Sequence, residues 1–221
     1  MNTMAADNIK LTYLVREPKI KTEKPPVIIL LHGVGSNERD LFSLADDLPP
    51  DFLVVSARGP ITLGPSRYAW YEVDFSTGRP SINAAQEATS RQMILNFIDE
   101  LQQRYSFDRS RVYLGGFSQG AIMSYSIGLT HPEKVKGLVI MSGRMLDEIK
   151  PLVAPREQLQ KLYVFISHGT KDGVLKVEYA RDARDYLKQA GIKPFYKEYA
   201  IAHTINGDVL KDLISWLLDT R

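Results

Sequence analysis

The segment Arg111-Val-Tyr-Leu-Gly-Gly-Phe-Ser-Gln-Gly-Ala-Ile-Met-Ser-Tyr125 joins an apolar, strand-like run to a small, apolar, helix-like run. Between the two runs, Gly116 and Gly120 stand two positions to either side of Ser118. Glycine at these positions lets a strand turn into a helix so sharply that a larger side chain would clash. Such a turn presents the serine at the carboxyl edge of a parallel sheet, where open α/β folds place their ligands. The segment therefore predicts an α/β fold with Ser118 at a functional edge.

The rest of the chain alternates between strand-like and helix-like segments. Strands are expected at residues 11–16, 26–31, 52–57, 112–115, 137–141, 163–167 and 194–199. Helices are expected at residues 83–104, 119–129, 177–189 and 207–219. Several strands lack polar alternation, which indicates burial on both faces of a parallel sheet. The pattern predicts a single α/β domain over residues 1–221, with a mostly parallel central sheet and helices on both faces.

Composition excludes several classes of protein. The 221 residues include no cysteine, which removes disulfides, thiolate metal sites and a cysteine nucleophile. Lys and Arg number 28 against 26 Asp and Glu, so no basic surface for nucleic acid is expected. No apolar run approaches the ~18 residues of a membrane span, and the first residues do not resemble a secretion signal. We therefore expect a cytoplasmic protein with no nucleic-acid partner and no stable membrane insertion.

A nucleophilic serine requires a base, and the base requires an orienting carboxylate. In this architecture the chain order is serine, acid, histidine. His203 follows the last expected strand, and Asp172 lies in the loop after the penultimate one. Glu178 and Asp182 are alternative acids, but both fall inside an expected helix. The sequence therefore predicts a catalytic triad of Ser118, Asp172 and His203.

The segment His32-Gly33-Val34-Gly35 follows the first strongly buried strand and suits half of an oxyanion hole. The backbone N–H groups of Val34 and Gln119 are the expected donors to a tetrahedral oxyanion. His32 is expected to pack or hydrogen-bond beneath this loop. His168 is expected to shape the loop that carries Asp172.

The long connection over residues 58–82 is rich in aromatic side chains. Connections of this length in compact domains are usually functional or mobile. Its apolar residues are expected to line an acyl pocket, and the alternative is that they only pack the loop itself. They are Leu63, Tyr68, Trp70, Tyr71 and Phe75. A second long connection covers residues 144–161.

Five short segments together resemble the carboxylesterase/phospholipase family of α/β-hydrolases. They are Leu-His-Gly-Val-Gly at 31–35, Ala-Arg-Gly-Pro at 57–60, Gly-Phe-Ser-Gln-Gly at 116–120, His-Gly-Thr-Lys-Asp at 168–172, and His203. The family includes bacterial carboxylesterases, lysophospholipases and acyl-protein thioesterases. The resemblance implies a compact fold without a large lid, a mechanism that needs no metal or cofactor, and often a homodimer.

By that resemblance Ser118, Asp172 and His203 occupy the triad positions, and Val34 and Gln119 the oxyanion positions. Trp70 and Tyr71 resemble the family's aromatic segment at the acyl site. The chain departs from the family's pattern at Ala121, where a second glycine is usual, in the acid loop, which lacks a proline, and before His203, where a glycine is usual.

These observations predict a serine hydrolase that cleaves carboxylic esters of small or medium acyl chains through an acyl-enzyme. The expected partner is a small-molecule ester. An acyl thioesterase with the same triad is the alternative reading, and an inactive scaffold with this fold is a third.

Overall fold

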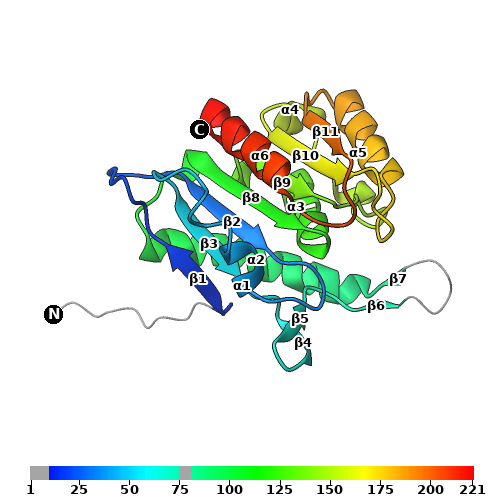
Figure 1. The fold of residues 1–221 in the computed structure, drawn as a ribbon, viewed down its shortest axis with the longest axis horizontal. Helices are drawn as coiled ribbons and strands as arrows, with labels where there is room; N and C mark the ends of the chain where they lie inside the picture. The colour runs from blue at the N-terminus through cyan, green and yellow to red at the C-terminus, as the bar shows by residue number, and fades with distance from the viewer. Residues whose placement is uncertain (1–9, 75–80) are drawn as a thin grey trace.

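The computed structural model describes residues 10–74 and 81–221. Its centre is a seven-stranded sheet (Figure 1). The strand order is β1-β3-β2-β8-β9-β10-β11. The strands are β1 (Tyr13–Arg16), β2 (Val27–Leu31), β3 (Leu53–Ala57), β8 (Val112–Phe117), β9 (Gly137–Met141), β10 (Tyr163–Gly169) and β11 (Phe195–Tyr199). Only β1 runs antiparallel to its neighbour in this sheet; the other neighbouring pairs are parallel. All seven expected strands are present, and the mostly parallel sheet is confirmed.

The central strands are buried on both faces, as their unbroken apolar runs indicate. In β2, Val27, Ile29 and Leu31 belong to one apolar core, while Ile28 and Leu30 belong to a second core. Successive side chains of a strand point to opposite faces. A strand covered on both sides therefore has no reason to alternate with polar residues.

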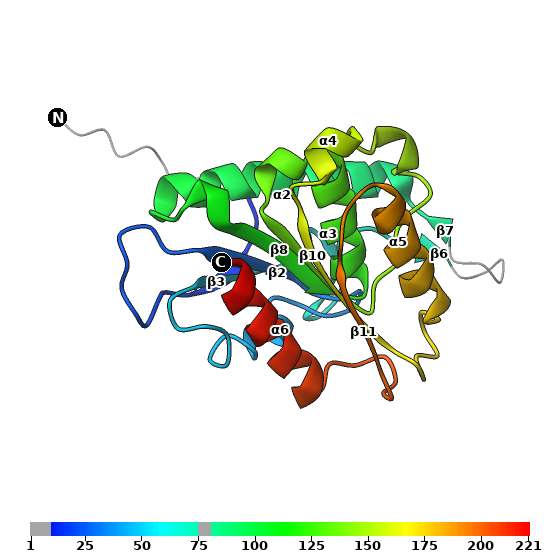
Figure 2. The ribbon, with the colours of Figure 1, turned by 90° about the horizontal axis from the view of Figure 1, so that it is seen from above.

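Helices cover the two faces of the sheet (Figure 2). One face carries α2 (Ala84–Arg104), α3 (Gln119–Thr130), α4 (Arg156–Leu159) and α5 (Glu178–Gln189); the other carries α1 (Arg39–Phe42) and α6 (Gly207–Thr220). The four longest match the expected helices to within a residue at each end. In the described part of the chain, no helix has the length and apolar character needed to cross a membrane.

The long connection over residues 58–82 contains two small antiparallel sheets. One pairs β4 (Ile61–Gly64) with β5 (Arg67–Ala69), and the other pairs β6 (Val73–Asp74) with β7 (Ser81–Ile82). Strands of two to four residues are too short to show a periodic pattern, so the sequence did not predict them. Phe75, expected in the acyl pocket, lies outside the described residues.

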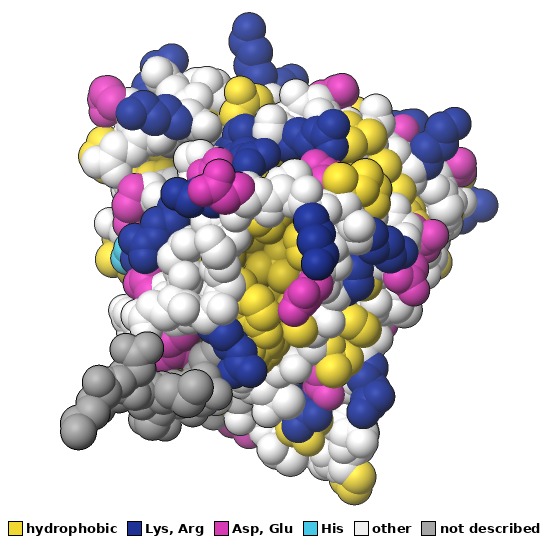
Figure 3. Space-filling view, turned by 90° about the vertical axis from the view of Figure 1, so that its left-hand side faces the viewer, with side chains coloured by type: hydrophobic (Ala, Val, Ile, Leu, Met, Phe, Trp, Pro, Cys, Tyr) yellow, Lys and Arg dark blue, Asp and Glu magenta, His cyan; other side chains and the backbone are white. Residues whose placement is uncertain are grey.

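The sheet ends on one side at β1, a short strand whose residues are all half-buried. Seen from this side, apolar side chains gather near the middle of the face and charged side chains surround them (Figure 3). Leu11, Tyr13 and Val15 pack against the core that also contains α2. The carboxyl ends of the parallel strands form a different edge of the sheet, where the expected catalytic residues lie.

Candidate active site

Ser118 occupies the turn between β8 and α3. Its backbone has φ 53° and ψ −115°, a conformation that non-glycine residues rarely adopt and that costs ~1–3 kcal/mol. The Ser118 N–H donates to the Met141 carbonyl of β9 at 3.0 Å, which ties the turn to the neighbouring strand. Among described residues the side chain caps no amide of α3, so the turn does not consume the hydroxyl.

Two glycines make this turn sterically possible. A Cβ atom on Gly120 would overlap the carbonyl of Leu31 in β2, and one on Gly116 would overlap the same oxygen. On Gly116 it would also lie 2.6 Å from the Gly120 carbonyl carbon. The expected need for glycine at both positions is therefore confirmed, with Leu31 as the obstructing group.

Asp172 and His203 meet at the same edge of the sheet. His203 Nδ1 donates to Asp172 Oδ2 at 2.6 Å, and the His203 ring lies 4.7 Å from the ring of Phe117, the neighbour of Ser118. A carboxylate can only accept hydrogen bonds, so Nδ1 carries the proton. In neutral His203 the free lone pair is therefore on Nε2, as a general base requires.

The acid loop holds Asp172 as a carboxylate. Its Oδ1 accepts the N–H of Val174 at 2.9 Å and of Leu175 at 2.8 Å. Burial alone would raise the pKa of Asp172, but the hydrogen bonds from His203 and the two amides outweigh burial and hold that pKa below its ordinary value. The side chain thus stays charged throughout the range in which histidine ordinarily titrates.

His168 is buried beneath the acid loop. Its Nε2 donates to the Leu175 carbonyl at 2.7 Å and lies 3.3 Å from Asp172 Oδ2. These contacts join the end of β10 to the loop that carries the acid. The structure therefore places His168 where it shapes this loop, as expected.

The loop after β2 lies directly beside Ser118. A Cβ built on Gly33 would be 3.4 Å from the Ser118 Cβ. Val34 and Gln119 line one cavity together with Ser118. Gln119 is the first residue of α3, so its N–H has no acceptor within the helix, and the helix dipole there favours negative charge. The two expected oxyanion donors are thus brought to one place.

His32 and Trp70 support this loop from below. His32 Nδ1 donates to the Gly33 carbonyl at 2.7 Å, and its Nε2 accepts the Gly59 N–H at 2.9 Å. Burial lowers the pKa of His32, so the ring stays neutral and keeps both bonds. Trp70 Nε1 donates to the His32 carbonyl at 3.0 Å.

Trp70 is therefore placed differently from the sequence expectation. Its side chain is 0% exposed and is not among the described residues that line the cavities near Ser118. The buried ring hydrogen-bonds to the His32 carbonyl, so it supports the loop after β2 and does not line the cavity. Tyr71 does line the cavity beside Ser118, as expected.

The side chain of Gln119 is a functional group that the sequence reasoning missed. Its Nε2 donates to the Tyr71 carbonyl at 2.7 Å, and its Oε1 accepts the Trp70 N–H at 2.9 Å. Both bonds are buried, so they fix residues 70–71 against the nucleophile turn. The only signal in the sequence was the position of Gln119 directly after Ser118. That position suggested a role for the backbone N–H of Gln119 but none for its side chain.

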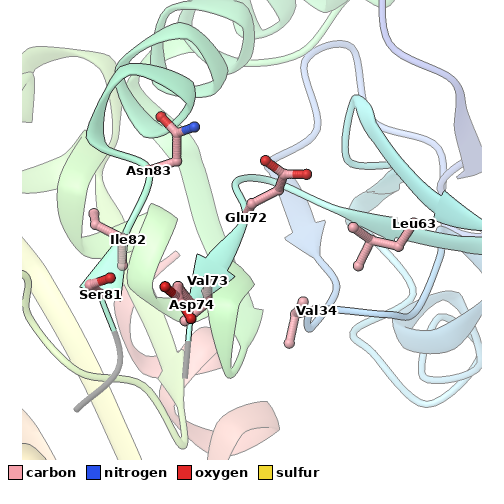
Figure 4. Close-up of a pocket in the computed structure, with 8 residues that line it drawn as sticks. All are labelled: Val34, Leu63, Glu72, Val73, Asp74, Ser81, Ile82 and Asn83. Carbon is pink, nitrogen blue, oxygen red and sulfur yellow. The ribbon is translucent and has the colours of Figure 1, made fainter. Parts of the chain in front are cut away.

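Two connected hollows lie on one side of Ser118. The smaller, of about 70 Å³, is lined mainly by apolar groups, namely Val34, Tyr71, Val73, Ile82, Ile122, Val174 and Leu175, with Ser118, Gln119 and Arg144. The larger, of about 680 Å³, shares Val34, Val73 and Ile82 with it. Figure 4 shows Leu63 and Val34 on one side of the larger hollow and the β6–β7 residues on the other. Leu63 thus lines only the larger hollow, whereas Tyr71 lines the smaller one together with Ser118.

A separate cavity of about 220 Å³ lies beside His203. Its lining includes His203, Phe117, Asp40 and Leu44 but not Ser118. Ser118 therefore lines a mainly apolar cavity, whereas His203 lines a more polar one.

Six further lining residues were not predicted: Val73, Ile82, Ile122, Arg144, Val174 and Leu175. Arg144 follows β9, and Val174 and Leu175 follow Asp172. All three could have been found from the rule that carboxyl ends of neighbouring parallel strands share an edge. Within residues 10–74 and 81–221, no group of three or more His, Asp or Glu could hold a metal ion.

Comparison with known proteins gives consistent results. A family model described as phospholipase/carboxylesterase matches residues 14–220. Acyl-protein thioesterase 1 of Emericella nidulans is 27% identical over 211 residues, covering 86% of this chain and 88% of that protein. The crystal structure of esterase PE8 has a TM-score of 0.80 at 27% identity, covering 96% of this chain and 100% of that one. The Bacillus cereus carboxylesterase structure has a TM-score of 0.83 at 23% identity, covering 97% and 96%, and shows the α/β-hydrolase fold.

Proposed function

The chain belongs to the phospholipase/carboxylesterase family, and we propose that it is a serine hydrolase that cleaves carboxylic esters through an acyl-enzyme. The observation that carries this proposal is the 2.6 Å bond from His203 to Asp172 at the edge where Ser118 holds a strained turn. That arrangement supplies a base of defined tautomer beside a hydroxyl that the fold does not otherwise use.

Acylation follows from the chemistry of these groups. His203 Nε2 removes the proton of Ser118 Oγ as the oxygen attacks the ester carbonyl. Asp172 stabilises the imidazolium that forms. The N–H groups of Val34 and Gln119 bind the developing oxyanion, and one such donor is commonly worth ~3 kcal/mol. The imidazolium then gives its proton to the departing alcohol.

Deacylation repeats the same steps with water. His203 takes a proton from the water that attacks the acyl-serine, and the second oxyanion forms in the same place. His203 then returns its proton to Ser118, and the carboxylic acid leaves. Every charge that develops has a partner supplied by this chain.

Thioester hydrolysis is the second candidate, because relatives of similar length carry the name acyl-protein thioesterase 1. The acyl-enzyme and its deacylation are the same for both substrates, and only the leaving group differs. The triad therefore supports both activities, and the two are separated by experiment.

The test compares an oxygen ester and a thioester of one acyl group, butyrate, with Ser118→Ala as the control. We expect the wild type to hydrolyse the oxygen ester and the control to lose at least about 10³-fold in kcat. Hydrolysis of the thioester alone would show that the protein is a thioesterase and not an esterase. A folded wild type that cleaves neither substrate would support the inactive scaffold and overturn the proposal.

Cytoplasmic location, a homodimer and independence from metals stay predictions. Cell fractionation, light scattering and a hydrolysis rate unchanged by EDTA would support them.

A further inference from the structure

One positive charge lines the otherwise apolar cavity beside Ser118. It belongs to Arg144, which is half-buried and contributes to this cavity of about 70 Å³. No other Lys, Arg or His is among the described residues that line it. Arg144 takes no part in the triad chemistry, so the role of a positive charge beside this cavity has still to be assigned.

The two residues before Arg144 fix the position of its backbone. Ser142 has φ 50° and its N–H donates to the Ser167 carbonyl at 2.9 Å. Gly143 packs against α3 so closely that a Cβ on it would lie 2.7 Å from the Ala121 Cβ. The arginine thus projects from a rigid turn that abuts the helix opened by Ser118.

No carboxylate within the described residues pairs with Arg144. Its recorded contact is with the ring of Tyr179, whose centroid lies 5.9 Å from the guanidinium carbon. Asp147, the nearest acid in sequence, instead pairs with Lys150 at 2.6 Å. Arg144 also lines a neighbouring cavity with Tyr179, Asp147 and Asp182, but it forms no ion pair with a carboxylate of the described residues. The guanidinium can therefore bind an anion that enters the cavity beside Ser118.

The catalytic chemistry assigns the two halves of an ester to different sides of the site. His203 must give a proton to the leaving alcohol, so the alcohol lies toward His203. The acyl group then occupies the cavity lined by Ser118, Gln119 and Arg144. Any anion that Arg144 binds belongs to the acyl part of the substrate.

We propose that Arg144 binds a carboxylate at the far end of a short acyl chain, so that the preferred substrates are monoesters of dicarboxylic acids. This inference rests on the proposed esterase function and names its acyl class. A guanidinium matches a carboxylate with two parallel hydrogen bonds. A phosphate monoester carries nearly two charges at neutral pH, and the single cation in this cavity would leave it half-neutralised. Ser118 and Arg144 line the same small cavity, so a spacer of a few carbons would join the carboxylate to the reacting carbonyl.

The test uses monoethyl succinate and ethyl 4-methylpentanoate, in which an isopropyl group replaces the carboxylate. The measured quantity is the ratio of kcat/KM for the charged ester to that for the neutral ester. We expect the wild type to favour the charged ester and Arg144→Gln to lower the ratio about 10- to 100-fold. Arg144→Lys keeps the charge without the planar fork and should fall between the two.

Arg39→Gln is the matched control, because Arg39 is exposed and precedes Asp40, which lines the cavity beside His203. It changes the net charge equally and should leave the ratio unchanged. Labelling of each variant by a fluorophosphonate confirms an assembled site. A ratio that Arg144→Gln leaves unchanged, in an enzyme that still cleaves the neutral ester, overturns this inference and leaves the esterase standing. A wild type that cleaves neither ester and is not labelled overturns both.

Discussion

Asp172 shows how one buried residue sets the chemistry of its neighbours. Two backbone amides occupy its Oδ1 and His203 occupies its Oδ2, so its charge is satisfied on both oxygens. Because a carboxylate only accepts, it determines which nitrogen of His203 is basic. The sequence predicted this acid from its place after a strand. It could not show the amides of Val174 and Leu175, because these depend on how the loop turns back on itself.

The pH dependence of kcat/KM follows from these bonds. His203 must be neutral to accept the serine proton, so kcat/KM should fall about tenfold per pH unit on the acidic limb. Asp172 should add no second step there, because its pKa lies below the ordinary range. Initial rates from pH 5 to 8 measure this limb, and a flat profile would exclude His203 as the base.

Asp172→Asn tests directly whether the carboxylate fixes the tautomer of His203. An amide can donate as well as accept, so it no longer forces the proton onto Nδ1, and kcat should fall by about 10⁴-fold. The thermal unfolding temperature and the crystal structure of the variant serve as controls for its fold. Activity within tenfold of the wild type would contradict the assigned role.

Among the elements, the turn from β8 into α3 controls the site. It brings Ser118 beside the loop after β2, and the carbonyl of Leu31 leaves no space for side chains at positions 116 and 120. The strand and helix boundaries were predictable because both-face burial and the glycine pattern are local signals. The strand order was not, since pairing such as β2 with β8 depends on packing between distant segments.

Gly120→Ala should abolish the turn. The added methyl would overlap the Leu31 carbonyl, so either α3 or β2 must move, at a cost of about 3 kcal/mol or more. We expect a lower urea midpoint and no esterase activity. Gly207→Ala is the matched control, because a Cβ at that position meets nothing within 4 Å, and the change should stabilise by up to about 1 kcal/mol. Equal midpoints for the two variants would show that the turn is not tightly packed.

The short strands of the connection over residues 58–82 illustrate the limit of local prediction. Aromatic composition indicated that the segment serves the site. It could not distinguish Tyr71, which lines the cavity, from Trp70, which hydrogen-bonds beneath the loop after β2. Neighbours in sequence point to opposite sides, and only the long-range contacts with His32 and Gln119 decide which side faces the cavity.

At the scale of the whole molecule, ion pairs join segments on which the site depends. Glu38, just after the oxyanion loop, accepts two hydrogen bonds of 2.6 Å from Arg58, just after β3. These bonds from Arg58 hold the pKa of Glu38 below its ordinary value. Hydrogen bonds from Arg181 likewise lower the pKa of Glu198 to about 2. Carboxylates of this kind make folding stability depend on pH.

The stability of the folded state should therefore fall over a defined range of acidic pH. Carboxyls with lowered folded pKa values contribute stability that is fully present above their unfolded pKa of about 4.3 and is lost as pH falls toward 2. The unfolding temperature should be level near neutral pH and should drop below about pH 4.5. Differential scanning calorimetry from pH 7 to pH 2 measures this drop.

Glu38→Gln tests whether Glu38 is one source of this loss of stability in acid. The side chain of Glu38 is only 4% exposed while that of Arg58 is 30% exposed, so removing the charge should cost about 2 kcal/mol at pH 7, or about 4–8 °C. The control Asp46→Asn breaks an exposed pair, with 84% of the Asp46 side chain accessible, and should change little. The variant should also show a shallower acid drop than the wild type. A drop as steep as that of the wild type would show that groups other than Glu38 cause the loss of stability in acid.

Intact-mass analysis after treatment with a fluorophosphonate probe tests most directly whether the three segments assemble an activated serine. The wild type should gain one adduct, and Ser118→Ala, folded by circular dichroism, should gain none. A folded wild type that stays unlabelled, or a Ser118→Ala variant that is labelled as fully as the wild type, would contradict an esterase built on Ser118.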